Sequence, residues 1–145
     1  MTALVTRTPI ALVLSGGGAR AAYQVGVLRA IAEALPPAAA LPFPDASINL
    51  VYSSLALEQM EQVRTQALGE MARVSAQYTL MLEPFWDCND TGLRRDYLLA
   101  RDHFRGQIDE LPGYGLEPIL ITDDLPGKIW LQPCLVVCRK RTAVR

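Results

Sequence analysis

The feature that most constrains this chain is a run of three glycines, Gly16–Gly18, between two apolar stretches. Residues 10–14 before the run are continuously apolar, which is typical of a buried parallel strand. Residues 20–34 after it carry apolar side chains at helical spacing and predict an amphipathic helix. Glycine lets the backbone approach a ligand closely, and a helix start offers N–H groups without partners. The run therefore predicts a site for negative charge, either a phosphate or an oxyanion.

Length and composition predict one globular domain of 145 residues, with 50% hydrophobic residues and a net charge of −1. This composition does not favour disorder, and the chain lacks the polybasic surface that would bind nucleic acid or an anionic membrane. No apolar run reaches the roughly 18 residues of a transmembrane helix. Three cysteines without a CxxC pair and one histidine do not predict a metal site. We expect a cytoplasmic protein.

The order of predicted elements indicates an α/β fold. After the first strand and helix comes a proline- and alanine-rich linker over residues 36–46. Further strands are predicted over residues 48–52, 78–82, 116–121 and 129–137, and helices over residues 57–76 and 93–104. This order predicts a three-layer fold with a mainly parallel sheet of about five strands that ends in a C-terminal antiparallel hairpin.

Residues 9–44 resemble the start of the patatin-like phospholipases, in which Gly-Gly-Gly-x-Arg/Lys follows the first strand and forms an oxyanion hole. The resemblance implies a lipid acyl hydrolase of the phospholipase or esterase type, acting on a lipid or ester without a cofactor. Its oxyanion loop would be Gly16, Gly17, Gly18 and Arg20. The chain departs from that family because it has no Gly-x-Ser-x-Gly nucleophile motif and no partner aspartate motif. We therefore expect an incomplete, inactive hydrolase.

Serines at the end of the second predicted strand are the alternative nucleophiles. Ser53 and Ser54 follow the strand where an elbow serine would lie, but they have no flanking glycines, so a turn or capping role is favoured. His103 is expected to be solvated or locally hydrogen-bonded. Phe85 and Trp86 follow a strand end, where they would either line a pocket or pack in the core. The acidic residues between positions 87 and 110 are expected on solvated faces.

Residues 47–140 resemble the C-terminal half of the class I S-adenosylmethionine-dependent methyltransferases. Residues 49–59 are similar to the fourth strand of that fold and the turn after it, and residues 82–85 to its fifth strand. The resemblance implies S-adenosylmethionine as the cofactor of this alternative. In that family the cofactor is held by a glycine loop after the first strand and an acidic residue that ends the second strand. Gly16–Gly18 is a conceivable substitute for the loop, although it lacks the third glycine of Gly-x-Gly-x-x-Gly.

The two resemblances together suggest a composite chain, joined between Phe43 and Asp45, with segments 1–44 and 45–145 in one composite domain. Three functional hypotheses remain open: an inactive patatin-like hydrolase, a methyltransferase remnant without its cofactor-binding half, and a non-catalytic chimeric α/β module. The sequence predicts no nucleic-acid partner, and it leaves the oligomeric state open.

Overall fold

A computed structural model describes residues 11–15, 41 and 43–141 of the chain. Its strands are β1 (Ala11–Ser15), β2 (Ile48–Ser54), β3 (Ser75–Glu83), β4 (Leu116–Thr122) and β5 (Cys134–Lys140). Its α-helices are α2 (Arg64–Val74) and α3 (Gly92–Arg101). Short 3₁₀ helices span Leu57–Gln59, Glu61–Val63, Trp86–Cys88 and Ile108–Tyr114. None of the helices in this described part is long and apolar enough to cross a membrane.

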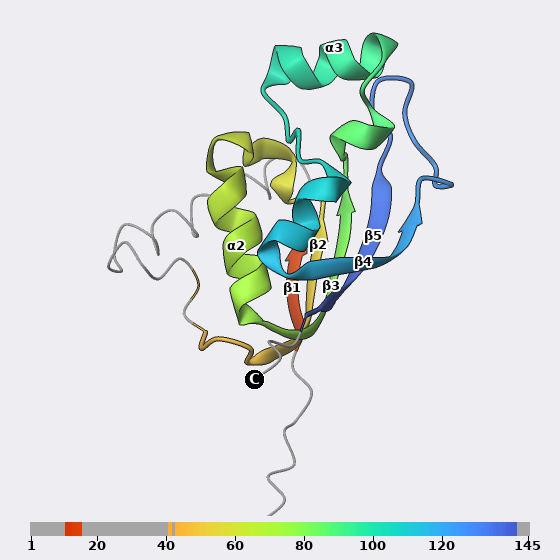
Figure 1. Cartoon of the computed structure of the whole chain (residues 1–145). Helices are drawn as coiled ribbons and strands as arrows, with labels where there is room; N and C mark the ends of the chain where they lie inside the picture. Colours follow the sequence, from red (N-terminus) through yellow and green to blue (C-terminus); the bar gives the residue numbers. More distant parts are fainter. Residues whose placement is uncertain (1–10, 16–40, 42, 142–145) are drawn as a thin grey trace, which may run out of the picture.

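The five strands form one mixed sheet in the order β1-β2-β3-β5-β4 (Figure 1). The first three strands are parallel, and β5 is antiparallel to both β3 and β4. The predicted fold class, a mainly parallel α/β sheet with a C-terminal antiparallel hairpin, is therefore confirmed. The predicted first strand joins the sheet in register, because Ala11 pairs with Leu50 and Ser15 with Ser54.

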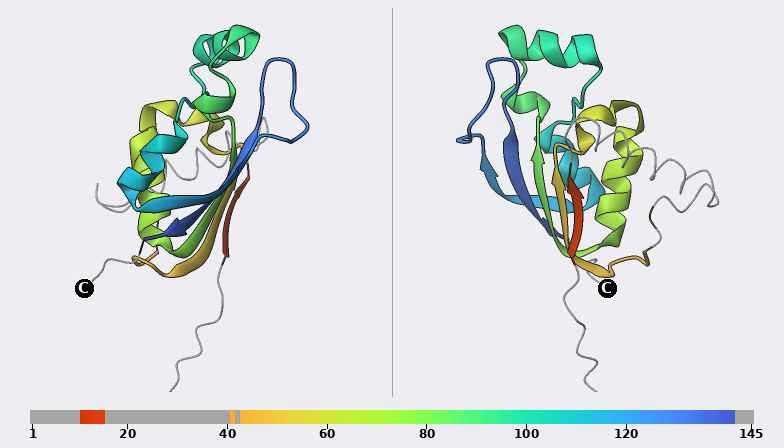
Figure 2. Two further views of the ribbon diagram at one scale, coloured as in Figure 1. Left: turned by 45° about the vertical axis from the view of Figure 1, so that its right-hand side comes forward. Right: turned by 180° about the vertical axis from the view of Figure 1, so that it is seen from behind.

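Helix α2 and the 3₁₀ helix Ile108–Tyr114 pack on one face of this sheet, whereas α3 lies beyond the carboxyl ends of the strands, as the views in Figure 2 show. Strand residues alternate between the two faces. Val51, Met81 and Val136 point to the helical side and are fully buried with Leu68 and Met71 of α2. Phe85, Phe104, Leu111 and Leu116 extend the same core. Of the three predicted layers, the described residues show the sheet and this helical layer.

Three predicted element bounds were wrong. The helix predicted over residues 57–76 is two short 3₁₀ helices followed by α2, and the helix predicted over residues 93–104 ends at Arg101, with Asp102 in the left-handed conformation. The strand predicted over residues 129–137 begins only at Cys134. Asn89 explains the late start, because its side-chain amide group exchanges hydrogen bonds of 2.8 Å with the backbone N–H and carbonyl of Gln132. These bonds fix the segment before β5 outside the sheet.

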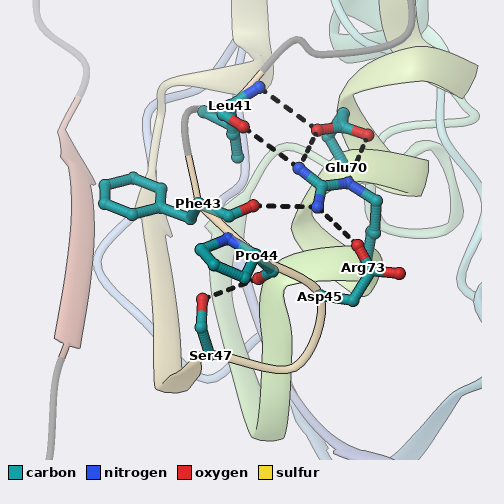
Figure 3. Close-up of polar contacts among 7 residues, drawn as sticks. All are labelled: Leu41, Phe43, Pro44, Asp45, Ser47, Glu70 and Arg73. Carbon is teal, nitrogen blue, oxygen red and sulfur yellow. Dashed lines mark hydrogen bonds and ion pairs between the residues drawn. The ribbon is translucent and has the colours of Figure 1, made fainter.

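The predicted join between Phe43 and Asp45 is fixed to α2 by one arginine (Figure 3). The Arg73 guanidinium donates to the backbone carbonyls of Leu41 and Phe43 at 3.1 and 2.9 Å, and it contacts Asp45 at 2.6 Å and Glu70 at 2.8 Å. Glu70 Oε2 in turn accepts the N–H of Leu41 at 3.2 Å. The hydrogen bond from Arg73 lowers the pKa of Glu70. Arg73 therefore joins the chain before β2 to the helix that follows it.

We expect Arg73→Ala to lower the free energy of unfolding by about 2 kcal/mol, because two backbone carbonyls and the partly buried Glu70 lose a charged donor. Asp45→Ala is the control. The Asp45 side chain is 79% exposed, so the change should cost under about 1 kcal/mol. Urea unfolding measures both. Equal losses of unfolding free energy in the two variants would show that the hydrogen bonds from Arg73 to the backbone carbonyls of Leu41 and Phe43 do not stabilise the fold.

Candidate functional site

The carboxyl ends of the three parallel strands lie at one edge of the sheet. Ser15 at the end of β1 pairs with Ser54 at the end of β2, and Ser54 pairs with Leu82 near the end of β3. In open α/β sheets, ligands bind in the crevice outside this carboxyl edge. The sequence continues from Ser15 directly into Gly16. The candidate site is therefore built from the turns that follow β1, β2 and β3.

The turn after β2 is shaped by the last residue of β3. Leu55 has a positive φ of 49°, and its N–H donates to the Leu82 carbonyl at 2.8 Å. The next two N–H groups, of Ala56 and Leu57, donate to the two carboxyl oxygens of Glu83 at 3.0 and 3.2 Å. Glu83 thus holds the first turn of the 3₁₀ helix Leu57–Gln59, whose N–H groups have no partner within the helix.

Glu83 is a fully buried carboxyl group with an unusual pKa. Burial raises its pKa from 4.5 to about 8, while the N–H groups of Leu57 and Ala56 and the nearby Ser53 hydroxyl oppose the rise. The nearby Ser53 hydroxyl is itself buried and has no well-directed hydrogen bond. The site therefore contains a carboxyl group whose protonation changes near neutral pH.

A histidine and a glutamate meet beside the same turn. Nδ1 of His103 lies 3.1 Å from Oε1 of Glu58, a close polar contact without the direction of a hydrogen bond. The backbone N–H of Phe104 donates to the Glu58 carbonyl at 2.9 Å, which holds this segment against the turn. The Tyr97 ring of α3 stacks on His103, with centroids 5.3 Å apart and planes inclined by 24°. His103 is therefore buried and not solvated, and it is the only histidine of the chain.

The sequence left two roles open for Phe85 and Trp86 after β3, lining a pocket or packing in the core, and the two residues differ in burial. Phe85 is fully buried and meets Phe104 edge-on, with centroids 5.4 Å apart, so it is a core residue. Trp86 is only partly buried and begins a 3₁₀ helix; its N–H donates to the Gly106 carbonyl at 3.0 Å. Phe85 therefore does not line a pocket.

The predicted site residues have different outcomes. Gly16, Gly17, Gly18 and Arg20 lie outside the described residues. Ser53 points into the core beside Glu83 and is fully buried, which does not suit a nucleophile. Ser54 lies at the next strand position, on the opposite face. The described side chains contain no group of three or more His, Cys, Asp and Glu residues that could hold a metal ion.

Two functional candidates were not found from the sequence: the role of Glu83 and the pairing of Glu58 with His103. The only local signal for Glu83 is a carboxylate at the end of an apolar strand, just before Pro84. Such a carboxylate is normally expected in solvent. The partners of both glutamates are 26 or more positions away, so no local pattern reports them.

Comparison with known proteins supports the methyltransferase part of the resemblance. Residues 19–78 match the family model described as a methyltransferase domain. No curated protein matches the chain significantly.

Among solved structures, a chain of the complex that contains the Haloferax volcanii Trm112 methyltransferase activator is similar, with a TM-score of 0.57 and 15% identity. That alignment covers 97% of this chain and 86% of the other. The YcgJ protein of Bacillus subtilis gives a TM-score of 0.54 at 15% identity, and the alignment covers 94% of each chain. An S-adenosylmethionine-dependent methyltransferase of Methanosarcina mazei gives 0.54 at 14% identity, over 70% of this chain and 63% of the other. At these identities the likeness concerns the fold.

These findings correct the hydrolase interpretation. The methyltransferase domain match begins within the segment assigned to the patatin-like resemblance and crosses the predicted join at residues 43–45. None of the findings shows a patatin-like segment. The predicted function as a phospholipase-type hydrolase was therefore wrong, as was the prediction that the chain has no cofactor. Strand–glycine–helix patterns serve oxyanion holes and nucleotide sites alike, because both use the same backbone N–H groups.

Proposed function

We propose that this chain is an S-adenosylmethionine-dependent methyltransferase domain that binds its cofactor at the carboxyl edge of the sheet, between the ends of β1 and β2. The observation that carries the proposal is the parallel pairing of these strands with their ends in register at Ser15 and Ser54. The methyltransferase domain match over residues 19–78 covers the chain that follows β1 and all of β2. Residues 1–44 and 45–145 then form one domain.

The residues at this edge suit the parts of the cofactor in different ways. The Gly16–Gly18 run follows β1 in the sequence, and glycines at this point let a backbone come close to a ligand. Glu58 is the carboxylate nearest in sequence to the end of β2, and its side chain is 19% exposed, so it suits the ribose hydroxyls. In the family the acid that holds the ribose ends the second strand, whereas residues 49–59 resemble the fourth strand, so Ser54 and the rest of β2 do not supply that acid. We therefore expect weak binding.

When bound, S-adenosylmethionine supplies an electrophilic methyl group on its sulfonium sulfur. The residues described here would then do three things. Glu83 holds the turn of Ala56 and Leu57 in place through their N–H groups. His103 offers an imidazole as a candidate proton acceptor, and the Glu58 carboxylate, 3.1 Å from its Nδ1, orients it.

Titration calorimetry with S-adenosylmethionine tests the proposal. We expect saturable binding with a dissociation constant between micromolar and millimolar, and loss of binding in Gly17→Val, because a branched side chain blocks the close approach of the backbone. Glu58→Gln should weaken binding about tenfold, as expected for one lost hydrogen bond to a charged group. Gly69→Ala in α2 is the control, since a Cβ there meets nothing within 4 Å. Absence of heat at millimolar cofactor, with the protein folded by circular dichroism, would overturn the proposal.

A further inference from the structure

Two of the three cysteines of this chain lie together where the segment after β3 meets the start of β5. Cys88 ends the 3₁₀ helix Trp86–Cys88, and Cys134 is the first residue of β5, where it pairs with Glu83 of β3. Both are free thiols in this structure. Cys134 is fully buried in the core, whereas Cys88 packs against that core and is half-buried. A buried sulfur therefore lies beside a sulfur that solvent reaches more easily.

Hydrogen bonds hold the two segments that carry these cysteines against each other. Asn89 follows Cys88 in the sequence, and its side-chain amide exchanges hydrogen bonds of 2.8 Å with the N–H and carbonyl of Gln132, two positions before Cys134. The same amide donates to the Phe85 carbonyl at 2.9 Å, and the Cys88 N–H donates to that carbonyl at 3.2 Å. The turn that contains Cys88 is therefore fixed beside the start of β5.

The two thiol groups interact directly, and each is the strongest influence on the pKa of the other. The contact with Cys88 lowers the pKa of Cys134, because a neighbouring S–H group stabilises a thiolate. The same contact, followed by burial, raises the pKa of Cys88. Burial and the carboxylates of Asp87 and Asp123 oppose a negative charge on either sulfur. The first ionisation of the pair therefore gives a single thiolate, which the remaining S–H group stabilises.

We propose that Cys88 and Cys134 form a redox-active dithiol, which a low-molecular-weight disulfide such as glutathione disulfide oxidises to an intramolecular disulfide. The Cys88 sulfur, the more exposed of the two, attacks as a thiolate and forms a mixed disulfide, while the S–S bond of the reagent breaks and one glutathione leaves. The Cys134 thiol then loses its proton and attacks the Cys88 sulfur, which releases the second glutathione. The two thiol protons pass to the two glutathione thiolates. Two protein thiols are thus oxidised, and one reagent disulfide is reduced.

The third cysteine provides an internal comparison. Cys138 lies on the same strand as Cys134 and pairs with Thr79 of β3. It is fully buried, and burial raises its pKa to about 11. A thiol with so high a pKa forms little thiolate near neutral pH, so it is a poor nucleophile. We expect Cys138 to stay reduced while the folded chain is oxidised.

Thiol counting on the full chain tests the proposal. The folded, reduced protein is incubated with glutathione disulfide, unfolded in urea with an alkylating reagent, and analysed by intact mass and peptide mapping. We expect alkylation of Cys138 alone and a cross-linked peptide that joins Cys88 to Cys134. Alkylation of all three cysteines would overturn the proposal. A glutathione adduct at Cys88 that persists beside an alkylated Cys134, or a disulfide to Cys138, would overturn it as well.

Three variants separate the two steps of the reaction. Cys134→Ala should stop at the mixed disulfide between Cys88 and glutathione, because no second thiol releases it. Cys88→Ala should form neither the mixed nor the intramolecular disulfide, since Cys134 is fully buried. Cys138→Ala is the matched control, because it removes a buried thiol from the same strand and should form the disulfide as the wild type does. Circular dichroism checks that each variant is folded, and a folded Cys138→Ala that forms no disulfide contradicts the pairing of Cys88 with Cys134.

Thermal unfolding of the oxidised and reduced wild type is an independent measurement. The disulfide closes the chain from residue 88 to residue 134 and so restrains the unfolded state. It also ties the segment that carries Trp86 and leads into α3 to the sheet. We expect the oxidised protein to melt about 5–10 °C above the reduced protein, and Cys88→Ala to show no such difference after the same treatment. An oxidised protein that melts at or below the reduced one would overturn the proposal, because the two thiols would then not be placed for a disulfide in the folded chain.

Discussion

Phe104→Ala is expected to lower the free energy of unfolding by about 3–5 kcal/mol, a large part of the roughly 5–15 kcal/mol that stabilises a domain of this size. The Phe104 ring is fully buried and packs edge-on against Phe85. Its backbone N–H is held by the Glu58 carbonyl, so the chain cannot easily move inward to fill the cavity. Urea unfolding followed by circular dichroism measures the loss.

Gly106 provides a sharper test of the same packing. The ring of Phe104 lies where a Cβ at Gly106 would be, with Cε1 and Cε2 only 2.8 Å from that position. We expect Gly106→Ala to cost about 1–3 kcal/mol in the wild type and clearly less in the Phe104→Leu background, where the end of the ring is removed. Gly113→Ala is the control, because a Cβ there meets nothing within 4 Å. If the losses caused by Gly106→Ala and Phe104→Leu simply add, the predicted contact between a Cβ at Gly106 and the Phe104 ring is contradicted.

The strands were predictable from the sequence because each is a short apolar run between turn-forming residues. Residues 48–52 and 116–121 lie within β2 and β4, and the predicted hairpin order was confirmed. The start of β5 was not predictable, since Ile129 and Trp130 are apolar like strand residues, yet they are 70% and 42% exposed. The amide of Asn89, 43 positions from Gln132, decides where that strand begins. Long-range polar contacts of this kind leave no periodic signal.

The apolar run over residues 10–14 correctly predicted β1, which ends at the carboxyl edge of the parallel strands. The anion or cofactor site predicted for the glycine run Gly16–Gly18 stays a prediction, because those residues lie outside the described part of the chain. The choice between a hydrolase and a methyltransferase could not be made from that run, because its backbone donors suit both anions and cofactors. The sequence predicted His103 only as a solvated or locally hydrogen-bonded residue, because its place beside Glu58 depends on how the segment after α3 returns to the turn after β2.

The buried Glu83 makes the free energy of unfolding depend on pH in the direction opposite to that of most carboxylates. The folded state keeps the Glu83 proton up to a pKa of about 8, whereas the unfolded state releases it near 4.5. Between these values the folded state binds more protons, so the free energy of unfolding falls as the pH rises. Below about 4.5 both states are protonated and above about 8 both are ionised, so the contribution of Glu83 is constant outside this window.

Glu83→Gln should therefore destabilise the protein at the acidic end of this pH window and stabilise it at the alkaline end. Glutamine keeps the shape of the side chain but offers one acceptor oxygen for the N–H groups of Ala56 and Leu57, which costs about 1 kcal/mol at pH values near 5. At pH values near 9 the variant should be the more stable protein, because it buries no charge. Urea unfolding of both proteins from about pH 5 to about pH 9 measures the difference at each pH. Other titrating groups cancel in this difference because they are common to both proteins.

Glu117→Gln, at a side chain that is 46% exposed on β4, is the control for the loss of a carboxylate. Its difference from the wild type should stay within about 1 kcal/mol across the range. A Glu83→Gln variant that is less stable than the wild type by the same amount at every pH would show that Glu83 is ionised in the folded protein throughout. The Glu83 carboxylate would then be held by Ala56 and Leu57 strongly enough to overcome its burial, and the turn at the proposed cofactor edge would depend on a permanent negative charge.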